Sequence, residues 1–144
     1  AKKLNKSRKS ISIFENITSG VISNSIKNFA NNRFKIGLTS ENENINEFLK
    51  KFNIEEKEQS PEKKCLMLAE FIKNISSSDI GFAYYGITTG DENVQNLGQG
   101  ESYFAIVDDA KHQIKHVRSA GIGVPDKRRA IMSSLSLIKS FLDN

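Results

Sequence analysis

The chain has 144 residues, of which 38% are hydrophobic and 26% charged, and its formal net charge is +4 at pH 7. These values are typical of one globular domain with a hydrophobic core. They exclude a membrane-spanning segment, because no apolar run approaches the roughly 18 to 20 residues that cross a bilayer. The basic start is not followed by the long apolar core that a signal peptide has, so we expect a cytoplasmic protein.

The positive charge is concentrated at the start of the chain. Five of the 21 basic residues lie within residues 1–9, which predicts a solvated, polar lead-in before a nearly neutral domain at residues 10–144. Basic and aromatic residues do not interleave as in RNA-binding proteins, so we expect no nucleic-acid partner. Two histidines and one cysteine, Cys65, are too few for a His/Cys metal cluster or an intrachain disulfide. We expect neither a metal nor a cofactor.

In chain order, the first predicted element is a strand at residues 10–14, where apolar residues alternate. The polar turn FENITSG (residues 14–20) leads into a helix at residues 20–31, with Thr18 or Ser19 as its expected N-cap. Residues 33–39 predict a second strand. Residues 45–52 have apolar residues at helical spacing and predict a short helix.

The second half begins with a helix from Pro61, with Ser60 as its N-cap. Its apolar face includes Cys65, which we interpret as a buried core thiol. Residues 79–87 form a continuous apolar run, as expected for a strand that is buried on both faces. Residues 102–107 and 112–118 predict an antiparallel hairpin. The last helix is expected to begin at Pro125–Asp126, with an inward face of Ile131, Leu135, Ile138, Phe141 and Leu142. We assign no role to His112 and His116, which share one face of the predicted hairpin.

This order of elements predicts one α/β domain. We expect a three-layer α/β/α sandwich with a mixed, partly parallel sheet. Ligands of such folds collect outside the carboxyl ends of the parallel strands. The candidate site therefore consists of residues 15–20 and 88–100, whose glycines, hydroxyls and helix-start amides could receive a phosphate, although such turns also occur without any ligand.

Four blocks of sequence resemble the CinA C-terminal domain family, which includes bacterial nicotinamide mononucleotide (NMN) amidohydrolases. ENITSG (residues 15–20) is similar to the family's E-S-x-T-G-G, and SDIGFAYYGITTG (residues 78–90) to its A-D-I-G-L-A-x-T-G-I-A-G-P. GESYFA (residues 100–105) is similar to G-T-V-Y-I-A, and RRAIMSSL (residues 128–135) to R-R-A-V-Q-A-A-L. The resemblance covers nearly the whole chain from residue 10 onward. It implies the family's fold, a small nucleotide ligand such as NMN, and a homo-oligomer, with a dimer favoured.

The sequence departs from the family's pattern at its catalytic positions. The resemblance places Asn16 at the nucleophilic serine, Asn44 at a lysine, Tyr85 at a threonine and Gly123 at an arginine. The nitrogen lone pair of an amide is delocalised, so Asn16 cannot attack a carboxamide as a serine hydroxyl does. We therefore predict a catalytically degenerate CinA-like domain that retains a binding or assembly role.

Two other hypotheses remain open. The first is an active amidohydrolase, which converts NMN to nicotinic acid mononucleotide and ammonia with Thr18, Ser19 or Ser40 as a rearranged nucleophile. The second is a scaffold that works by self-association and whose pocket is a relic. Glu15 is also interpreted as a brace of the turn, since carboxylates are common near helix N-termini. The resemblance implies substrate-binding roles for seven residues: Glu15, Asn16, Gly20, Tyr85, Gly86, Thr88 and Gly100.

Overall fold

The computed structural model describes residues 2–16, 18, 20–40, 50–51, 60–88, 99–120 and 127–143. Lys50 and Lys51 are helical and belong to the predicted helix at 45–52, the rest of which lies outside the described residues. The other elements follow in the predicted order, with one addition at the start of the chain. They are α1 (Lys2–Ser7), β1 (Ile11–Asn16), α2 (Val21–Phe29), β2 (Phe34–Ser40), α4 (Pro61–Ser76), β3 (Ile80–Thr88), β4 (Gln99–Val107), β5 (His112–Ala120) and α5 (Lys127–Asp143).

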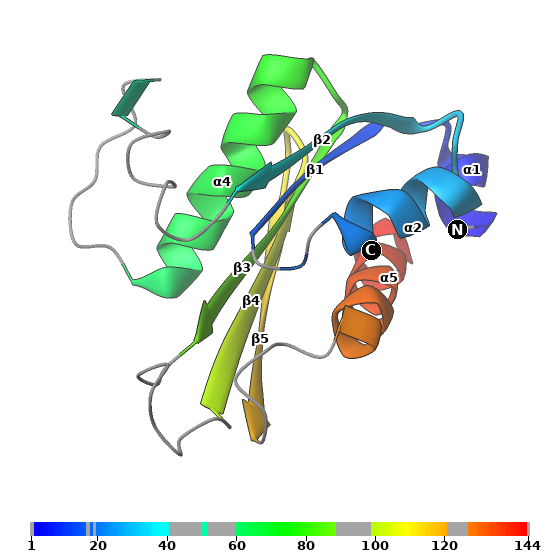
Figure 1. Cartoon of the computed structure of the whole chain (residues 1–144). Helices are drawn as coiled ribbons and strands as arrows, with labels where there is room; N and C mark the ends of the chain where they lie inside the picture. The colour runs from blue at the N-terminus through cyan, green and yellow to red at the C-terminus, as the bar shows by residue number, and fades with distance from the viewer. Residues whose placement is uncertain are drawn as a thin grey trace.

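The five strands form one mixed sheet in the order β2-β1-β3-β4-β5 (Figure 1). β1 lies between β2 and β3 and is parallel to both. β4 is antiparallel to β3, and β5 is antiparallel to β4. The structure confirms the predicted combination of early parallel strands and a late antiparallel hairpin.

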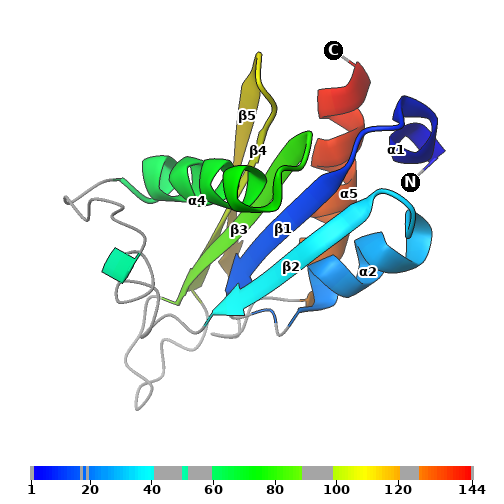
Figure 2. The same ribbon diagram turned by 90° about the horizontal axis from the view of Figure 1, so that it is seen from above.

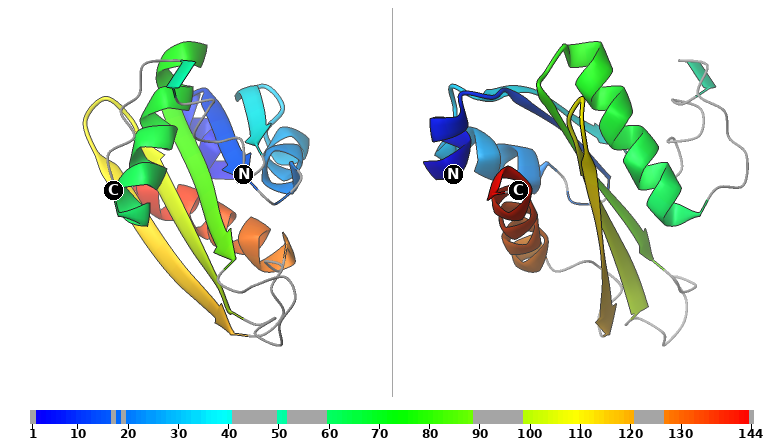
Figure 3. Two further views of the ribbon diagram at one scale, coloured as in Figure 1. Left: turned by 60° about the vertical axis from the view of Figure 1, so that its left-hand side comes forward. Right: turned by 180° about the vertical axis from the view of Figure 1, so that it is seen from behind.

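Helices cover both faces of the sheet, which confirms the three-layer α/β/α sandwich (Figures 2 and 3). α4 packs on one face over β1, β3 and β4, and α1, α2 and α5 lie on the other side. Each face has its own apolar cluster. The cluster between α4 and the sheet contains Phe14, Cys65, Leu68, Ala69, Ile72, Ala83, Tyr103, Ala105 and Val107. The larger cluster on the opposite face includes Leu4, Ile11, Ile13, Ile22, Ile26, Phe82, Phe104, Ile138 and Phe141.

The helix α4 follows its sequence signals closely. Ser60 is the N-cap, and its hydroxyl accepts a hydrogen bond from the Lys63 amide at 3.3 Å. Most of the predicted apolar face is buried, including Cys65, whereas Leu66 is half-buried. The helix lies directly on β3 at Gly81, where an added Cβ would stand 2.1 Å from the carbonyl oxygen of Ala69. A glycine is needed there because no side chain fits between helix and strand.

The expected solvated lead-in is a helix. Residues 2–7 form α1, and Leu4 is buried in the cluster of the α2 and α5 side. The Asn5 side-chain amide donates to the carbonyl oxygen of Phe29 at the end of α2, at 3.1 Å. The basic residues concealed this element from sequence analysis, because a single buried leucine produces no apolar periodicity.

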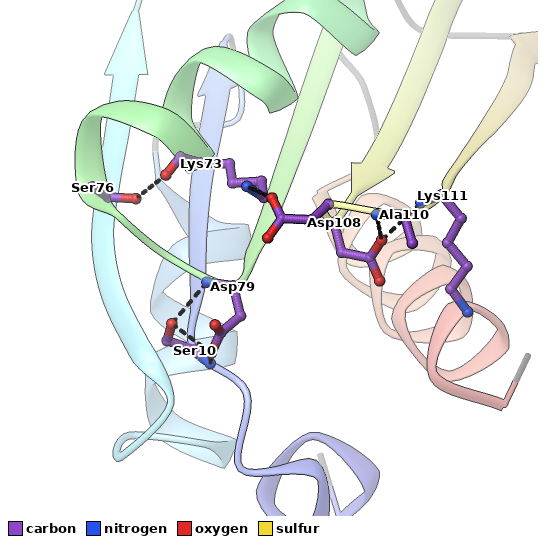
Figure 4. A network of polar contacts seen from close by, with 8 residues as sticks. Ser10, Lys73, Ser76, Asp79, Asp108, Ala110 and Lys111 are labelled. Atoms are coloured by element: carbon purple, nitrogen blue, oxygen red, sulfur yellow. Dashed lines mark hydrogen bonds and ion pairs between the residues drawn. The ribbon is translucent and has the colours of Figure 1, made fainter.

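The hairpin of β4 and β5 holds the end of the last helix. The Asp108 carboxylate accepts from the amides of Ala110 and Lys111 at 2.7 and 2.8 Å (Figure 4). Burial raises the pKa of Asp108, but these hydrogen bonds together with the charges of Lys9 and Lys111 outweigh it and lower the pKa overall. Lys111 Nζ donates to the carbonyl oxygen of Phe141 at 2.8 Å, which satisfies a carbonyl in the last turn of α5.

The inward face of α5 differs partly from the expected one. Ile138 and Phe141 are buried as expected, whereas Ile131, Leu135 and Leu142 are only half-buried. Ala130, Ser134 and Leu137 occupy the buried positions instead. The predicted helix start at Pro125–Asp126 lies outside the described residues.

Candidate functional site

The candidate site lies where the three parallel strands end along one edge of the sheet (Figure 2). The register places Asn16, the last residue of β1, beside Ser40, the last residue of β2. Glu15 pairs with Tyr84 of β3. The sheet therefore brings Glu15, Asn16, Ser40, Tyr85 and Gly86 to one region, as expected from parallel strands.

The remaining predicted site residues are described only in part. Thr88 and Gly100 are register partners in the β3–β4 ladder, but the structure does not describe their side chains. Ser19, Asn44 and Gly123 lie outside the described residues. So do residues 89–98, which make up most of the predicted loop 88–100. The candidate nucleophile Ser19 is therefore not placed.

Glu15 is a fully buried carboxylate at the end of β1. Its Oε1 accepts from the Thr18 hydroxyl at 2.6 Å and from the Ile22 amide at 3.2 Å. Its Oε2 accepts from the amide and the hydroxyl of Ser23 at 2.8 and 2.7 Å. Four donors compensate the burial of this charge, and two of them are amides of the first turn of α2. Glu15 thus braces the strand-to-helix turn.

The expected N-cap of α2 was Thr18 or Ser19, and for Thr18 this prediction is wrong. The N-cap is Gly20, whose φ of 80° lies in the left-handed region that favours glycine and which offers no side-chain cap. The hydroxyl of Thr18 donates to Glu15 and lies 3.2 Å from the carbonyl oxygen of Asn16. Glu15 replaces the cap from the preceding strand, seven residues before Ile22.

The four amides from Val21 to Asn24 at the start of α2 are all hydrogen-bonded within the fold. The Val21 amide donates to the Thr18 carbonyl at 3.3 Å, and the Asn24 amide donates to the Gly20 carbonyl at 3.0 Å. The two amides between them, those of Ile22 and Ser23, donate to Glu15. The first turn of a helix binds phosphate through free amides, so a phosphate would have to displace Glu15 here.

Asn16 is fully buried and is hydrogen-bonded to β3 in both directions. Its Oδ1 accepts from the Gly86 amide at 2.7 Å, and its Nδ2 donates to the Gly86 carbonyl at 3.1 Å. The last backbone register pair between these strands joins Glu15 to Tyr84. The Asn16 side chain therefore joins β1 to β3 beyond the last backbone register pair of the two strands.

Ser23 takes part in this arrangement although sequence analysis did not single it out. Its amide and its hydroxyl both contact Glu15. The opposing residue on β2 is Gly37, where an added Cβ would stand 2.7 Å from Ser23 Oγ. The only signal for Ser23 in the sequence is a serine in the first turn of a helix that follows a strand ending near a glutamate. This pattern is common and therefore does not indicate the contact by itself.

The candidate nucleophiles differ in their exposure. Thr18 is fully buried, with its hydroxyl held by Glu15, whereas Ser40 is half-buried at the end of β2. Tyr85 is also half-buried, and Lys64 Nζ lies 5.5 Å from the centroid of its ring. Burial raises the pKa of Tyr85, so its phenol stays protonated at neutral pH.

Cys65 lies in the cluster between α4 and the sheet, against which Tyr85 also packs, and the two histidines lie on β5. Cys65 is fully buried, its Sγ lies 3.4 Å from the carbonyl oxygens of Ala83 and Tyr103, and burial raises its pKa. The ring of His116 stacks on Tyr103 with centroids 4.4 Å apart, on the β4–β5 ladder. Within the described ranges, no three His, Cys, Asp or Glu side chains are grouped closely enough to hold a metal ion. None of the described helices is long and apolar enough to cross a membrane.

Comparisons with known proteins identify the fold. No family model matches the sequence, and no curated protein matches it. A CinA superfamily protein from Klebsiella pneumoniae has a similar structure, with a TM-score of 0.76 and 16% identity, over 99% of this chain and 92% of that one. One from Enterobacter cloacae gives 0.72 and 20%, over 98% and 86%. The competence/damage inducible protein CihA from Agrobacterium tumefaciens gives 0.67 and 14%, over 99% and 90%. The chain therefore has the fold of the CinA superfamily, as the resemblance of its sequence blocks implied.

Proposed function

We propose that this chain is a CinA-like domain that does not hydrolyse NMN and that retains a binding or assembly role. The observation that carries the proposal is the state of Asn16, the residue at the position of the family's nucleophile. It has no nucleophilic atom, it is fully buried, and its amide is bonded twice to Gly86.

The surroundings of Asn16 support the same conclusion. A catalytic base must be able to take a proton from the nucleophile and pass it on. The Glu15 carboxylate holds two amides and a hydroxyl of α2 in addition to Thr18, so its contacts serve the turn. The amides at the start of α2 are also occupied. These groups act within the fold, and a ligand would meet none of them free.

The retained role is then the binding of a small nucleotide elsewhere along this edge of the sheet, or self-association. Calorimetric titration with NMN measures the first, and light scattering on the purified chain measures the second. A dimer in light scattering is the expected result for an assembly role. A monomer that also fails to bind NMN would contradict both forms of the retained role.

Ammonia release from NMN tests the loss of catalysis. The native chain and Asn16→Ser are assayed together, with Ser40→Ala as a variant that changes a neighbouring hydroxyl. We expect no release by the native chain. Release at roughly 1 per second or faster, which is ordinary enzymatic turnover, would contradict the proposal. Activity that appears only in Asn16→Ser would attribute the loss to this one residue.

An active amidohydrolase remains the second candidate, and one observation favours it. Ser40 is the register partner of Asn16 and is half-buried, so its hydroxyl is nearer to solvent than that of Thr18. If Ser40 were the nucleophile, the native chain would release ammonia and Ser40→Ala would abolish it. The same loss in Thr18→Ala with activity intact in Ser40→Ala would assign the role to Thr18 instead.

A further inference from the structure

The backbone of Gly86 presents one amide and one carbonyl toward the end of β1. A strand residue offers its N–H and its C=O to the same neighbouring strand. β1 ends at Asn16, and its last register pair with β3 joins Glu15 to Tyr84. The backbone of β1 therefore does not pair with the N–H and C=O of Gly86. The Asn16 side chain contacts both, at 2.7 and 3.1 Å. We infer that Gly86 forms a recognition site for a primary carboxamide, and that the chain fills this site with its own Asn16.

The chemistry of the pair selects the class of ligand. A primary carboxamide carries a donor and an acceptor side by side, and so matches an N–H and a C=O on one strand edge. A carboxylate offers only acceptors, an ammonium group offers only donors, and a tertiary amide offers no donor. Asn16 and Gly86 are both buried, so water cannot correct a mismatch. An unpaired buried donor or acceptor is strongly unfavourable, which makes the selection sharp.

The inference predicts that the site accepts an external ligand once Asn16 is shortened. Asn16→Ala removes the carboxamide, leaves both Gly86 groups without this partner, and opens a space of about the size of the lost group. A small carboxamide that binds there stabilises the folded state by mass action, because the unfolded chain has no such site. Acetamide has the carboxamide of asparagine with a single methyl group.

The inference rests on the proposed function only in requiring that the Asn16 amide be committed to Gly86. The two fail separately. Ammonia release by the native chain overturns the proposed function and leaves the carboxamide site in place. Absence of any effect of acetamide on Asn16→Ala overturns the carboxamide site and leaves the loss of catalysis in place.

The test compares melting temperatures of the native chain, Asn16→Ala and Ile72→Ala with increasing acetamide. Ile72 belongs to α4 and is fully buried in the cluster between this helix and the sheet, so its variant is a control that is destabilised by an apolar cavity. Acetate and N,N-dimethylacetamide at equal concentrations are the control ligands. We expect acetamide to raise the melting temperature of Asn16→Ala by roughly 3 °C or more relative to the other two proteins. The control ligands should produce no such difference. An equal response of all three proteins to acetamide would overturn the inference.

A second comparison applies if Asn16→Ala does not fold alone. The variant is refolded from urea with acetamide or with N,N-dimethylacetamide, and recovery is followed by circular dichroism. Recovery with acetamide alone supports the site, and equal recovery with both amides, or with neither, overturns it. In the native chain, the Asn16 side-chain amide protons should exchange slowly with solvent by NMR. Rapid exchange would contradict the contact on which the inference is built.

Discussion

Polar side chains form hydrogen bonds at both ends of the β1–β3 pair. These side chains are exposed to solvent at one end and buried at the other. Where β3 begins, Asp79 and Ser10 exchange hydrogen bonds at the surface, with the Ser10 amide 2.9 Å from Asp79 Oδ2 and the Asp79 amide 2.9 Å from Ser10 Oγ (Figure 4). Where β1 ends, Glu15 and Asn16 make similar contacts but are fully buried. Water can replace the first set of contacts and cannot replace the second, so the buried end should contribute more stability.

The comparison also bears on function. Buried polar side chains at the carboxyl ends of parallel strands are typical of a ligand site. Here their hydrogen bonds hold the start of α2 and the end of β3. At the exposed end, the hydrogen bonds of Ser10 and Asp79 lie beside the close packing of α4 on β3 at Gly81. The predictions below test this contrast, beginning with the largest expected effect.

The first prediction concerns the buried carboxylate. Glu15→Ala removes the acceptor of four hydrogen bonds and leaves the Ile22 and Ser23 amides unpaired at the start of α2. We expect the free energy of unfolding to fall by about 4 kcal/mol, several times the loss of an exposed contact. The urea midpoint measures it. Glu70→Ala, an exposed change on α4, is the control and should stay within about 0.5 kcal/mol. Similar losses in the two variants would remove the contrast.

The second prediction tests packing at the opposite end. In Gly81→Ala the new Cβ would meet the backbone of Ala69, which cannot rotate away. We expect the free energy of unfolding to fall by about 3 kcal/mol as α4 moves off the sheet. Gly37→Ala is the matched glycine, because its new Cβ would meet the side chain of Ser23. We expect Gly37→Ala to lower the free energy of unfolding by less than Gly81→Ala does. An equal loss would show that the Ser23 side chain cannot move aside for the new Cβ any more easily than the Ala69 backbone can.

The third prediction uses pH to separate the two hydrogen bonds of Asn16. Asn16→Asp keeps an acceptor for the Gly86 amide but, when ionised, places a charge against the Gly86 carbonyl. Burial and this repulsion should raise the pKa of the new carboxyl above the unfolded value of about 3.9. The variant then loses stability relative to the native chain as pH rises through the raised pKa, by about 2 kcal/mol at pH 7. Urea midpoints at pH 4.5 and 7 measure the loss, which a pH-independent difference would contradict.

The smallest effect is expected at Asp79. The Ser10 backbone amide, with the Ser10 hydroxyl and nearby lysines, lowers the pKa of this exposed carboxyl. A lowered folded pKa means that the contribution to stability is present above the unfolded pKa of about 3.9 and is lost as pH falls through the folded value. Asp79→Asn should therefore differ from the native chain by less than 1 kcal/mol at pH 7 and by still less at pH 3. A difference that grows toward low pH would reverse the assigned sign.

The sequence predicted those parts of the molecule whose signals are local. Ser60 and Pro61 mark the start of α4 within a few residues, and the apolar run of β3 indicates a strand buried on both faces. The hairpin of β4 and β5 was predicted because its strands are neighbours in sequence. The order of these elements was sufficient for the layers and for the mixed sheet.

The site was predictable in position but not in its contacts. Glu15 was expected to brace the turn, and it does, but its reach to Ile22 and Ser23 removed the need for Thr18 as a cap. The partner of Asn16 is Gly86, 70 residues later, and no local pattern connects them. Sequence resemblance placed Asn16 at the position of the family's nucleophilic serine, whereas only the structure shows what its amide contacts.

The place of β1 between β2 and β3 has a consequence for the order in which the protein folds. β1 precedes both of its neighbours in the sequence, and its pairing with β3 closes a separation of 69 residues between Ser10 and Asp79. Contacts between distant residues form late because loop closure is entropically unfavourable. β4 and β5 can pair as soon as both have left the ribosome, but one edge of β1 must keep its backbone N–H and C=O groups unpaired until β3 arrives. During synthesis, that edge is the part of the chain most exposed to mispairing with other chains.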